Sequence, residues 1–240
     1  MMLPVLYRDD DLVVVHKPSG LFVHRTALDR SATEFALQTV RDQIGQAVFP
    51  VHRLDRATSG ALIFALSQKA ARSMTESFAA GKIEKTYLAV VRGTPEPLIH
   101  VDYPLKEILD RKTDRRAHPD KEAQVAVTDF ETLKTCEFSV KVDKYPTSRY
   151  ALVRARPKTG RKHQIRRHLD HLGHPIIGDT TYGSGKHNRF FEATFGVQRM
   201  LLACTELVFS HPFSKQRVQI SAPLAREFAE LLEKIKWKPT

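Results

Sequence analysis

The segment from His52 to Gly60 places a single carboxylate, that of Asp55, between two arginines, Arg53 and Arg56. It closes on a small polar turn and is followed by an apolar run, residues 61–66, with the length and composition of a buried strand. A polar loop held by a rigid strand is a common place for catalytic groups. Because opposite charges favour the ionised form, we expect Asp55 to be a carboxylate that can act as a base or as a nucleophile. Taken alone, such a loop more often only caps a turn and pairs locally, so its chemistry depends on what accompanies it.

Four further segments combine charged or aromatic residues with turn residues: His16–Gly20, Lys85–Tyr87, Thr159–Arg166 and His174–Asp179. Together with the Asp55 loop, and in this order along the chain, they resemble the motifs of the RluA-type pseudouridine synthases. The resemblance extends from about residue 5 to about residue 220. Linking segments at residues 38–43, 145–147 and 166–169 are most similar to a branch of this family that modifies tRNA.

The resemblance implies an isomerase, with Asp55 acting on one uridine of tRNA, uridine 65. In this family an aspartate promotes cleavage of the N-glycosidic bond, the uracil rotates within the pocket, and C5 joins C1′ of the ribose. The sequence leaves open whether Asp55 bonds covalently to the sugar or removes a ribose proton. Since uridine and pseudouridine are isomers, the reaction needs no cofactor, and we expect neither a cofactor site nor a metal site.

The same resemblance implies three more catalytic residues. Arg166 is expected to pair with Asp55, and Tyr87 to line the pocket beside it, where a phenol can stack on uracil. Arg53 is expected to occupy the gap left by the flipped base, because a uridine in a stem must leave its stack before the chemistry.

A helix expected at about residues 162–172 supports the position of Arg166. Ile165, Leu169 and Leu172 form its core-facing stripe, and Arg166 lies one position away, at the edge of the buried face. A partly buried arginine needs an anionic partner, although without the resemblance a surface charge would be the favoured interpretation. Exposed basic side chains here and in the Asp55 loop suit phosphate contacts, and we predict RNA binding by Arg56, Arg161, Lys162, His163 and Arg167.

Composition agrees with a nucleic-acid partner. The chain has 240 residues, and its lysines and arginines exceed its aspartates and glutamates by 38 − 27 = 11. A balance this basic indicates a polyanion, with a solubilising surface charge as the alternative. Two cysteines far apart in the sequence, and the lack of a secretory or membrane-length apolar run, predict a reducing, cytoplasmic location. We expect tRNA as the partner, with no membrane and no obligatory protein partner.

Apolar patterns and turn residues predict a single α+β domain over residues 1–240, with a mixed, mainly antiparallel sheet flanked by helices. No separate N-terminal RNA-binding domain is expected, which favours a compact substrate such as tRNA over ribosomal RNA. The expected helices are one after the capping-box segment Ser31–Glu34, ending near Gly45, one from Ser67 to Gly81, one at about 162–172 and one at 224–236. The expected strands are 5–7, 12–16, 61–66, 84–92, 125–135, 137–142, 150–156, 200–209 and 217–221, with basic loops at 106–122 and 183–189.

Other functions stay open at this point. One is a pseudouridine synthase acting on ribosomal RNA, another is a non-catalytic RNA-binding module, and a third is an RNA hydrolase that uses Asp55 as a base. A zinc site is disfavoured, because the expected helix turns its dense histidines to different faces and no cysteine or carboxylate completes a tetrahedral set.

Overall fold

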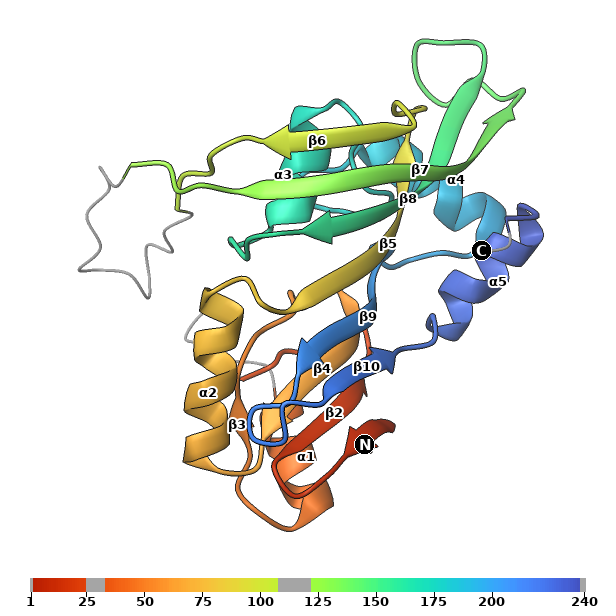
Figure 1. The fold of residues 1–240 in the computed structure, drawn as a ribbon. Coiled ribbons are helices and arrows are strands. Elements are labelled where there is room, and N and C mark those ends of the chain that lie inside the picture. Colours follow the sequence, from red (N-terminus) through yellow and green to blue (C-terminus); the bar gives the residue numbers. More distant parts are fainter. Residues whose placement is uncertain (1, 25–32, 108–121, 238–240) are drawn as a thin grey trace.

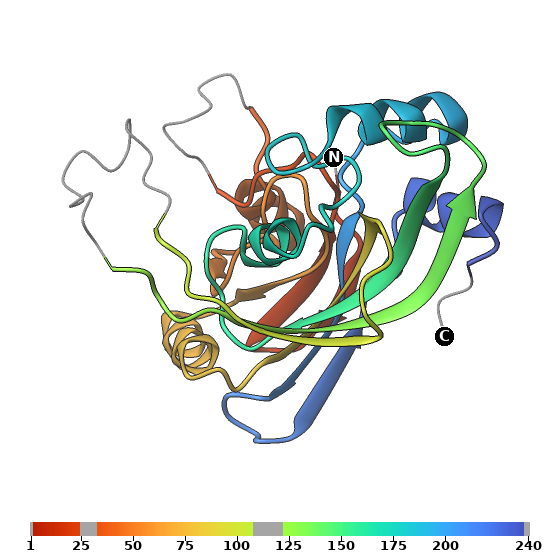
Figure 2. The ribbon, with the colours of Figure 1, turned by 90° about the horizontal axis from the view of Figure 1, so that it is seen from above.

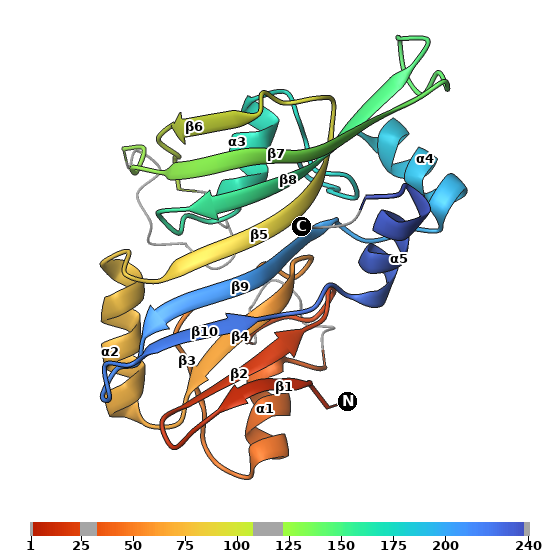
Figure 3. The ribbon, with the colours of Figure 1, turned by 45° about the vertical axis from the view of Figure 1, so that its right-hand side comes forward.

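A computed structural model describes residues 2–24, 33–107 and 122–237. In these residues one ten-stranded sheet has the order β1-β2-β4-β9-β5-β8-β7-β6, with β10 beside β9 and β3 beside β4 (Figure 3). The strands are β1 (Val5–Arg8), β2 (Leu12–Lys17), β3 (Phe49–Pro50), β4 (Ser59–Ala65), β5 (Glu84–Arg92), β6 (Leu98–Asp102), β7 (Val127–Phe138), β8 (Ser148–Pro157), β9 (Leu202–Ser210) and β10 (Arg217–Ser221).

Among the strand pairs of the described chain, only β4 and β9 run parallel. The predicted mixed, mainly antiparallel sheet is therefore confirmed. The described residues also form five helices that flank it: α1 (Ala36–Ile44), α2 (Gln68–Ala79), α3 (Gln164–His171), α4 (Gly185–Phe195) and α5 (Arg226–Lys234) (Figure 1). No helix in the described ranges has the length and apolar character needed to span a membrane.

Strand β5 is covered on both faces because side chains alternate along a strand. Tyr87, Ala89 and Val91 belong to the apolar core that also contains Ile165 and Leu169 of α3. The intervening Leu88 and Val90 belong to a second core, with Phe191 of α4 and Phe228 of α5. Helices α1 and α3 lie on the same side of the sheet when it is seen from above (Figure 2). This double cover makes the centre of the sheet the rigid part of the scaffold.

Several predicted boundaries are right because local residues determine them. Ser67 caps α2, with its side chain accepting a hydrogen bond from the amide of Ala70 at 3.1 Å. Gly45 ends α1 in the left-handed conformation, at a φ of 77°. Strand β10 has the predicted limits.

The start of α1 was predicted wrongly. The helix begins at Ala36 after Phe35, which is buried and has no side-chain cap, and not at the capping-box segment. The amide of Ala36 instead binds the carbonyl of Phe22 at 2.8 Å, so tertiary contacts begin this helix. Ser31 lies outside the described residues, as does most of the basic loop predicted at 106–122.

Three strands predicted between residues 125 and 156 are in fact two. Strand β7 continues through Cys136 and Glu137, which pair with Tyr150 and Arg149 of β8. A local irregularity falls between Thr132 and Lys134, yet the ladder resumes beyond it. Pairing with the long strand β8 therefore keeps the chain extended at residue 136, where the sequence alone predicts a break between two strands.

The prediction of a basic loop at 183–189 is also wrong, because α4 begins at Gly185. His187 and Phe191, four residues apart on this helix, are both buried against the second core. Packing of that apolar face offsets the weak helix propensity of its glycine and asparagine. The short strands β3 and β6 were not predicted.

The β4–β9 pairing requires glycine at position 60. Gly60 has a φ of 111°, and a Cβ there would lie 2.0 Å from the carbonyl oxygen of Cys204. No side chain fits in that space, and L residues avoid this backbone conformation. Gly60 therefore allows β4 and β9 to pair immediately after the Asp55 loop.

We expect Gly60→Ala to lower the free energy of unfolding by about 3 kcal/mol or more, since it combines overpacking with a strained backbone. Urea denaturation followed by circular dichroism measures this change. Gly160→Ala is the control, because a Cβ at Gly160 meets no atom within 4 Å. Equal stability of the two variants would contradict the packing argument.

Candidate active site

A pocket of about 570 Å³ opens between the Asp55 loop, strand β5 and the beginning of α3. It brings together seven of the nine residues predicted for the site, from segments more than 100 positions apart in the sequence. These are Arg53, Asp55, Tyr87, Arg161, Lys162, His163 and Arg166. The other two, Arg56 and Arg167, do not line it.

Arg166 contacts two carboxylates. Its Nε donates to Oδ2 of Asp179 at 2.6 Å and its Nη2 to Oδ1 of Asp179 at 2.8 Å, which is a bidentate pair. Its Nη1 reaches Oδ2 of Asp55 at 3.3 Å. The predicted contact between Arg166 and Asp55 is therefore present. Asp179, which was not predicted as a partner, takes both parallel bonds.

Asp179 is the site residue that sequence reasoning missed. Its side chain is fully buried and also accepts hydrogen bonds from the amides of Thr181 and Tyr182. Burial alone would raise the pKa of Asp179, but Arg166 and these amides hold it below its ordinary value. Asp179 is therefore a carboxylate at neutral pH. The sequence contained a signal for Asp179. A buried arginine such as Arg166 needs an anionic partner, and the motif His174–Asp179 ends in an aspartate.

One oxygen of Asp55 stays free for chemistry. Arg166 at 3.3 Å and the Nε2 of His163 at 3.9 Å both approach Oδ2, while Oδ1 has no hydrogen-bond partner in the described part of the chain. The side chain is 19% exposed, so a ligand in the pocket can reach it. Asp55 is thus held by one oxygen and presented by the other.

A buried lysine anchors the loop that carries Asp55. Lys17 is fully buried, and its Nζ donates to the carbonyls of Pro18, Leu21 and Arg56 at 2.9, 2.8 and 3.1 Å. Burial lowers the pKa of Lys17 to about 7, while the negative charge of Asp55 opposes the shift. Three carbonyl acceptors match the three N–H groups of an ammonium ion. Lys17 therefore ties the turn after β2 to the Asp55 loop.

The beginning of α3 is built by side chains of the motif at 159–166. Gln164 accepts from the hydroxyl of Thr159 at 2.7 Å and from the amide of Arg161 at 2.9 Å. Its amide group donates to the carbonyl of Val127 and the hydroxyl of Thr128, both at 2.9 Å. The first two bonds hold the turn before α3 and the last two attach α3 to β7, so that Arg166 faces the pocket.

His163 precedes α3 with a φ of 57°, in the left-handed region that side chains rarely adopt. This conformation turns its ring into the pocket, where Nδ1 lies 3.1 Å from the hydroxyl of Tyr182. Burial lowers the pKa of His163, against the effect of Asp55, so the ring is mainly neutral at pH 7. Tyr182 also covers Arg166, whose guanidinium lies 5.0 Å from the ring centroid. His163 is therefore part of the pocket wall.

Tyr87 lies on β5 and is 8% exposed. Its position beside Asp55 in the pocket is the predicted one. Burial, followed by the neighbouring thiol of Cys204, raises the pKa of Tyr87 well above its ordinary value. The phenol therefore keeps its proton and presents a neutral, flat surface to a ligand.

Arg56 and Arg167 have local partners. The Nε of Arg56 donates to the carbonyl of Gly20 at 3.0 Å, and its guanidinium lies 4.7 Å from the ring centroid of Phe22. Arg167 donates to the carbonyl of Lys106 at 2.9 Å.

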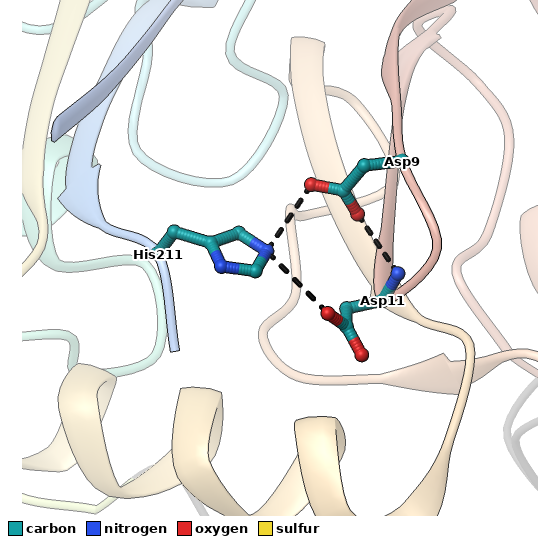
Figure 4. A group of neighbouring side chains, drawn as sticks. All are labelled: Asp9, Asp11 and His211. Atoms are coloured by element: carbon teal, nitrogen blue, oxygen red, sulfur yellow. Dashed lines mark hydrogen bonds and ion pairs between the residues drawn. The ribbon is translucent and has the colours of Figure 1, made fainter. Parts of the chain in front are cut away.

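A second cluster, away from the pocket, joins Asp9, Asp11 and His211 within 4.8 Å of one another (Figure 4). The Nδ1 of His211 lies 3.2 Å from the amide of Ser214, which places the ring proton on Nε2 in the neutral form. The Nε2 atom of His211 lies 3.1 Å from Oδ2 of Asp9, but the two groups are not aligned for a hydrogen bond.

This arrangement opposes a metal ion. A metal on Nε2 needs a proton on Nδ1, where metal-bound histidines usually donate to an oxygen, yet here an amide N–H points at Nδ1. Asp9 is also engaged, because one oxygen accepts the amides of Asp11 and Leu12 and the other accepts the hydroxyl of Tyr7. The cluster therefore fits a link between the β1–β2 turn and the end of β9.

Comparison with known proteins agrees with this geometry. The human RNA Pseudouridylate Synthase Domain Containing 1 superposes with a TM-score of 0.68 at 26% identity, covering 99% of this chain and 96% of that one. The human RNA Pseudouridylate Synthase Domain Containing 4 has the same fold, with a TM-score of 0.72 at 24% identity over 97% of this chain and 92% of that one. Residues 11–171 match the RNA pseudouridylate synthase family. The chain belongs to this family and is an isomerase.

Relatives within the family are similar over nearly their whole length. The tRNA pseudouridine synthase C of Vibrio cholerae is 51% identical, covering 99% of this chain and 97% of the relative. The protein of the same name from Haemophilus ducreyi is 49% identical, with the same coverage.

If the Asp9–Asp11–His211 cluster is a metal-free link, removing divalent cations with EDTA should leave the melting temperature unchanged. His211→Ala should lower the free energy of unfolding by about 1 kcal/mol, because it removes a buried ring that accepts the amide of Ser214 and adjoins the half-buried carboxylates of Asp9 and Asp11. Differential scanning calorimetry with and without added Zn²⁺ or Ca²⁺ checks both. A rise in melting temperature with a metal ion, lost in His211→Ala, would show a metal site instead.

Proposed function

We propose that this protein isomerises one uridine of tRNA to pseudouridine, with Asp55 as the catalytic carboxylate. The observation that carries the proposal is the contact of Asp55 with Arg166 in a pocket also lined by Tyr87. Arg166 orients one carboxylate oxygen and leaves the other available. This is the arrangement needed to act on a ribose at the base of the pocket.

The reaction breaks the N-glycosidic bond between N1 and C1′ and forms a bond between C5 and C1′. The C5 hydrogen leaves as a proton, and N1 gains one, so the product is an isomer of the substrate. Asp55 acts either by bonding to the sugar or by removing a ribose proton, and both routes need an ionised carboxylate with a free oxygen. Tyr87 offers its ring to the uracil while the base rotates.

Arg53 is proposed to hold the RNA open. It is exposed and lies in the lining of the pocket, on the same loop as Asp55. A uridine that leaves a stem loses stacking and pairing worth a few kcal/mol. A guanidinium in the vacated position can offset part of that loss by stacking on neighbouring bases.

The choice of tRNA is supported by the name shared by the relatives at 51% and 49% identity over nearly the full chain. It agrees with the excess of 11 positive charges. Uridine 65, implied by the resemblance of the motif sequence, is part of this proposal. Arg161 and Lys162 at the pocket, with Arg167 beside it, are proposed to contact phosphates. We place the reaction in the cytoplasm, in agreement with the free cysteines Cys136 and Cys204.

Asp55→Asn should retain the fold and tRNA affinity but lose at least a thousandfold in turnover, since an amide can neither attack the sugar nor take a proton. Tritium release from tRNA labelled at C5 of uridine measures turnover, and fluorescence anisotropy measures binding. The control is Asp170→Asn, an exposed carboxylate on α3 that should keep wild-type turnover.

Residual turnover of Asp55→Asn within tenfold of wild type would exclude Asp55 as the catalytic carboxylate. Wild-type protein that binds tRNA without releasing tritium would favour a non-catalytic RNA-binding module. Release from ribosomal RNA alone would assign the activity to that substrate instead.

Arg166→Lys should reduce turnover at saturating tRNA by about a hundredfold. Lysine keeps the charge but cannot bind Asp179 through a planar fork while also reaching Asp55. Arg167→Lys, next to it on α3, is the matched control and should change turnover less than threefold. Equal turnover of the two lysine variants would show that the fork of Arg166 is unimportant.

Asp179→Asn tests the same contact from the buried side. It removes the anion that fixes Arg166, so we expect a loss of turnover close to that of Arg166→Lys. In the double variant Arg166→Lys/Asp179→Asn, the loss of turnover should be smaller than the product of the two single losses. Turnover and tRNA affinity should both be measured for each variant. Neither substitution is expected to alter the affinity for tRNA more than threefold. Additive losses would contradict a single Asp179–Arg166–Asp55 unit.

A further inference from the structure

A second pocket, of about 310 Å³, lies at the opposite end of β5 from Tyr87. It is formed by the end of β5, the β7–β8 hairpin, the residues after α3 and the first turn of α4. The basic side chains in its wall are Arg92, Arg149, His174 and His187. The hydroxyl residues Thr94, Thr147 and Ser148 also line it.

The two arginines of this pocket form no ion pair with a carboxylate of the described residues, although Asp143 lies close enough to attract Arg92 at longer range. Asp143 is the carboxylate in the wall, and it pairs with Lys186 at 2.5 Å. Neither guanidinium, of half-buried Arg92 or of exposed Arg149, has a hydrogen bond or an ion pair within the described residues. Because a partly buried arginine is costly without an anion, the pocket is suited to an anionic ligand.

The two histidines add nitrogen atoms without partners. The Nδ1 of His174 donates to the carbonyl of Arg92 at 3.0 Å, so its Nε2 remains available. The Nδ1 of His187 lies 2.8 Å from the hydroxyl of Tyr150, and its buried Nε2 has no hydrogen-bond partner in the described chain. His187 is 4% exposed, so this unpartnered nitrogen lies inside the pocket wall rather than in solvent.

We propose that this pocket binds a phosphate group of the tRNA backbone, outside the active-site pocket. The proposal rests on the proposed function for its choice of RNA. Guanidinium forks, hydroxyl groups and imidazole nitrogens are the groups that contact phosphate oxygens. Arg92 follows Tyr87 by five residues on β5, roughly 17 Å at about 3.3 Å per residue. A tRNA bound at Asp55 extends beyond that distance.

The test compares two charge-matched double variants. Arg92→Gln/Arg149→Gln removes the cations of the pocket, and Arg217→Gln/Arg226→Gln removes two arginines of β10 and α5. Arg217 is bonded to Gln219 and Arg226 to Glu230 at the protein surface. Binding of tRNA is followed by anisotropy between low and physiological salt, and turnover by tritium release.

We expect the pocket variant to bind tRNA about tenfold more weakly, with a salt slope smaller by about one. Its turnover at saturating tRNA should stay within twofold of wild type, and the control should bind within twofold. Inorganic phosphate should shift the imidazole NMR resonances of His174 and His187 in wild type but not in the pocket variant. If the double variant is unstable, the same measurements are made with Arg149→Gln alone, because Arg149 is exposed and its substitution should not affect folding.

Equal weakening of both double variants would overturn the proposal, since only overall charge would then matter. Phosphate shifts without any effect of the pocket variant on tRNA binding would assign the pocket to a small anion and overturn the RNA contact. If wild type binds tRNA through this pocket but releases no tritium, the proposed function fails and the phosphate site stands.

Discussion

The buried arginine between two carboxylates is the constraint on which the site depends. Arg166 donates two short bonds to Asp179 and a longer one to Asp55. Breaking a buried ion pair on one side leaves an uncompensated charge, which costs about 3–5 kcal/mol. The strong pair with Asp179 therefore fixes the position of the guanidinium, and the weaker contact with Asp55 follows from it. Asp55 can be held in place without losing its free oxygen.

Charges of opposite sign alternate from Asp179 through Arg166 and Asp55 to Lys17. Asp55 and Asp179 supply two negative charges, and Arg166 together with the ammonium form of Lys17 supplies two positive ones, while His163 is mainly neutral. Burial opposes the charge on Lys17, and Asp55 favours it. The lysine that ties the loop to the core therefore also balances the acid that the loop carries. The backbone adds a separate condition, since β4 approaches β9 after the loop only with glycine at position 60.

The two pockets lie at opposite ends of β5 and differ in what their charges contact. In the active-site pocket, buried anions of the protein occupy the arginine, so the basic groups there orient a carboxylate. In the second pocket the arginines form no hydrogen bond or ion pair in the described chain, so their N–H groups are available to a ligand. Basic residues of one protein can therefore have different roles. Burial and pairing decide whether a cation orients a catalytic carboxylate or binds the RNA backbone.

The sequence by itself determined what local chemistry determines. The apolar run after the Asp55 loop predicts β4, Ser67 predicts the cap of α2, and the pattern at 217–221 predicts β10. The motifs identified the family, and seven of the nine residues predicted for the site line the pocket. Tertiary structure alone decided the rest. Asp179 became the main partner of Arg166, residues 185–195 became a helix, and residues 127–138 became one strand, because in each case the deciding contact comes from a distant part of the chain. Sequence spacing constrains which neighbours share a helix face or a strand face, whereas which elements lie side by side depends on the order of strands in the sheet.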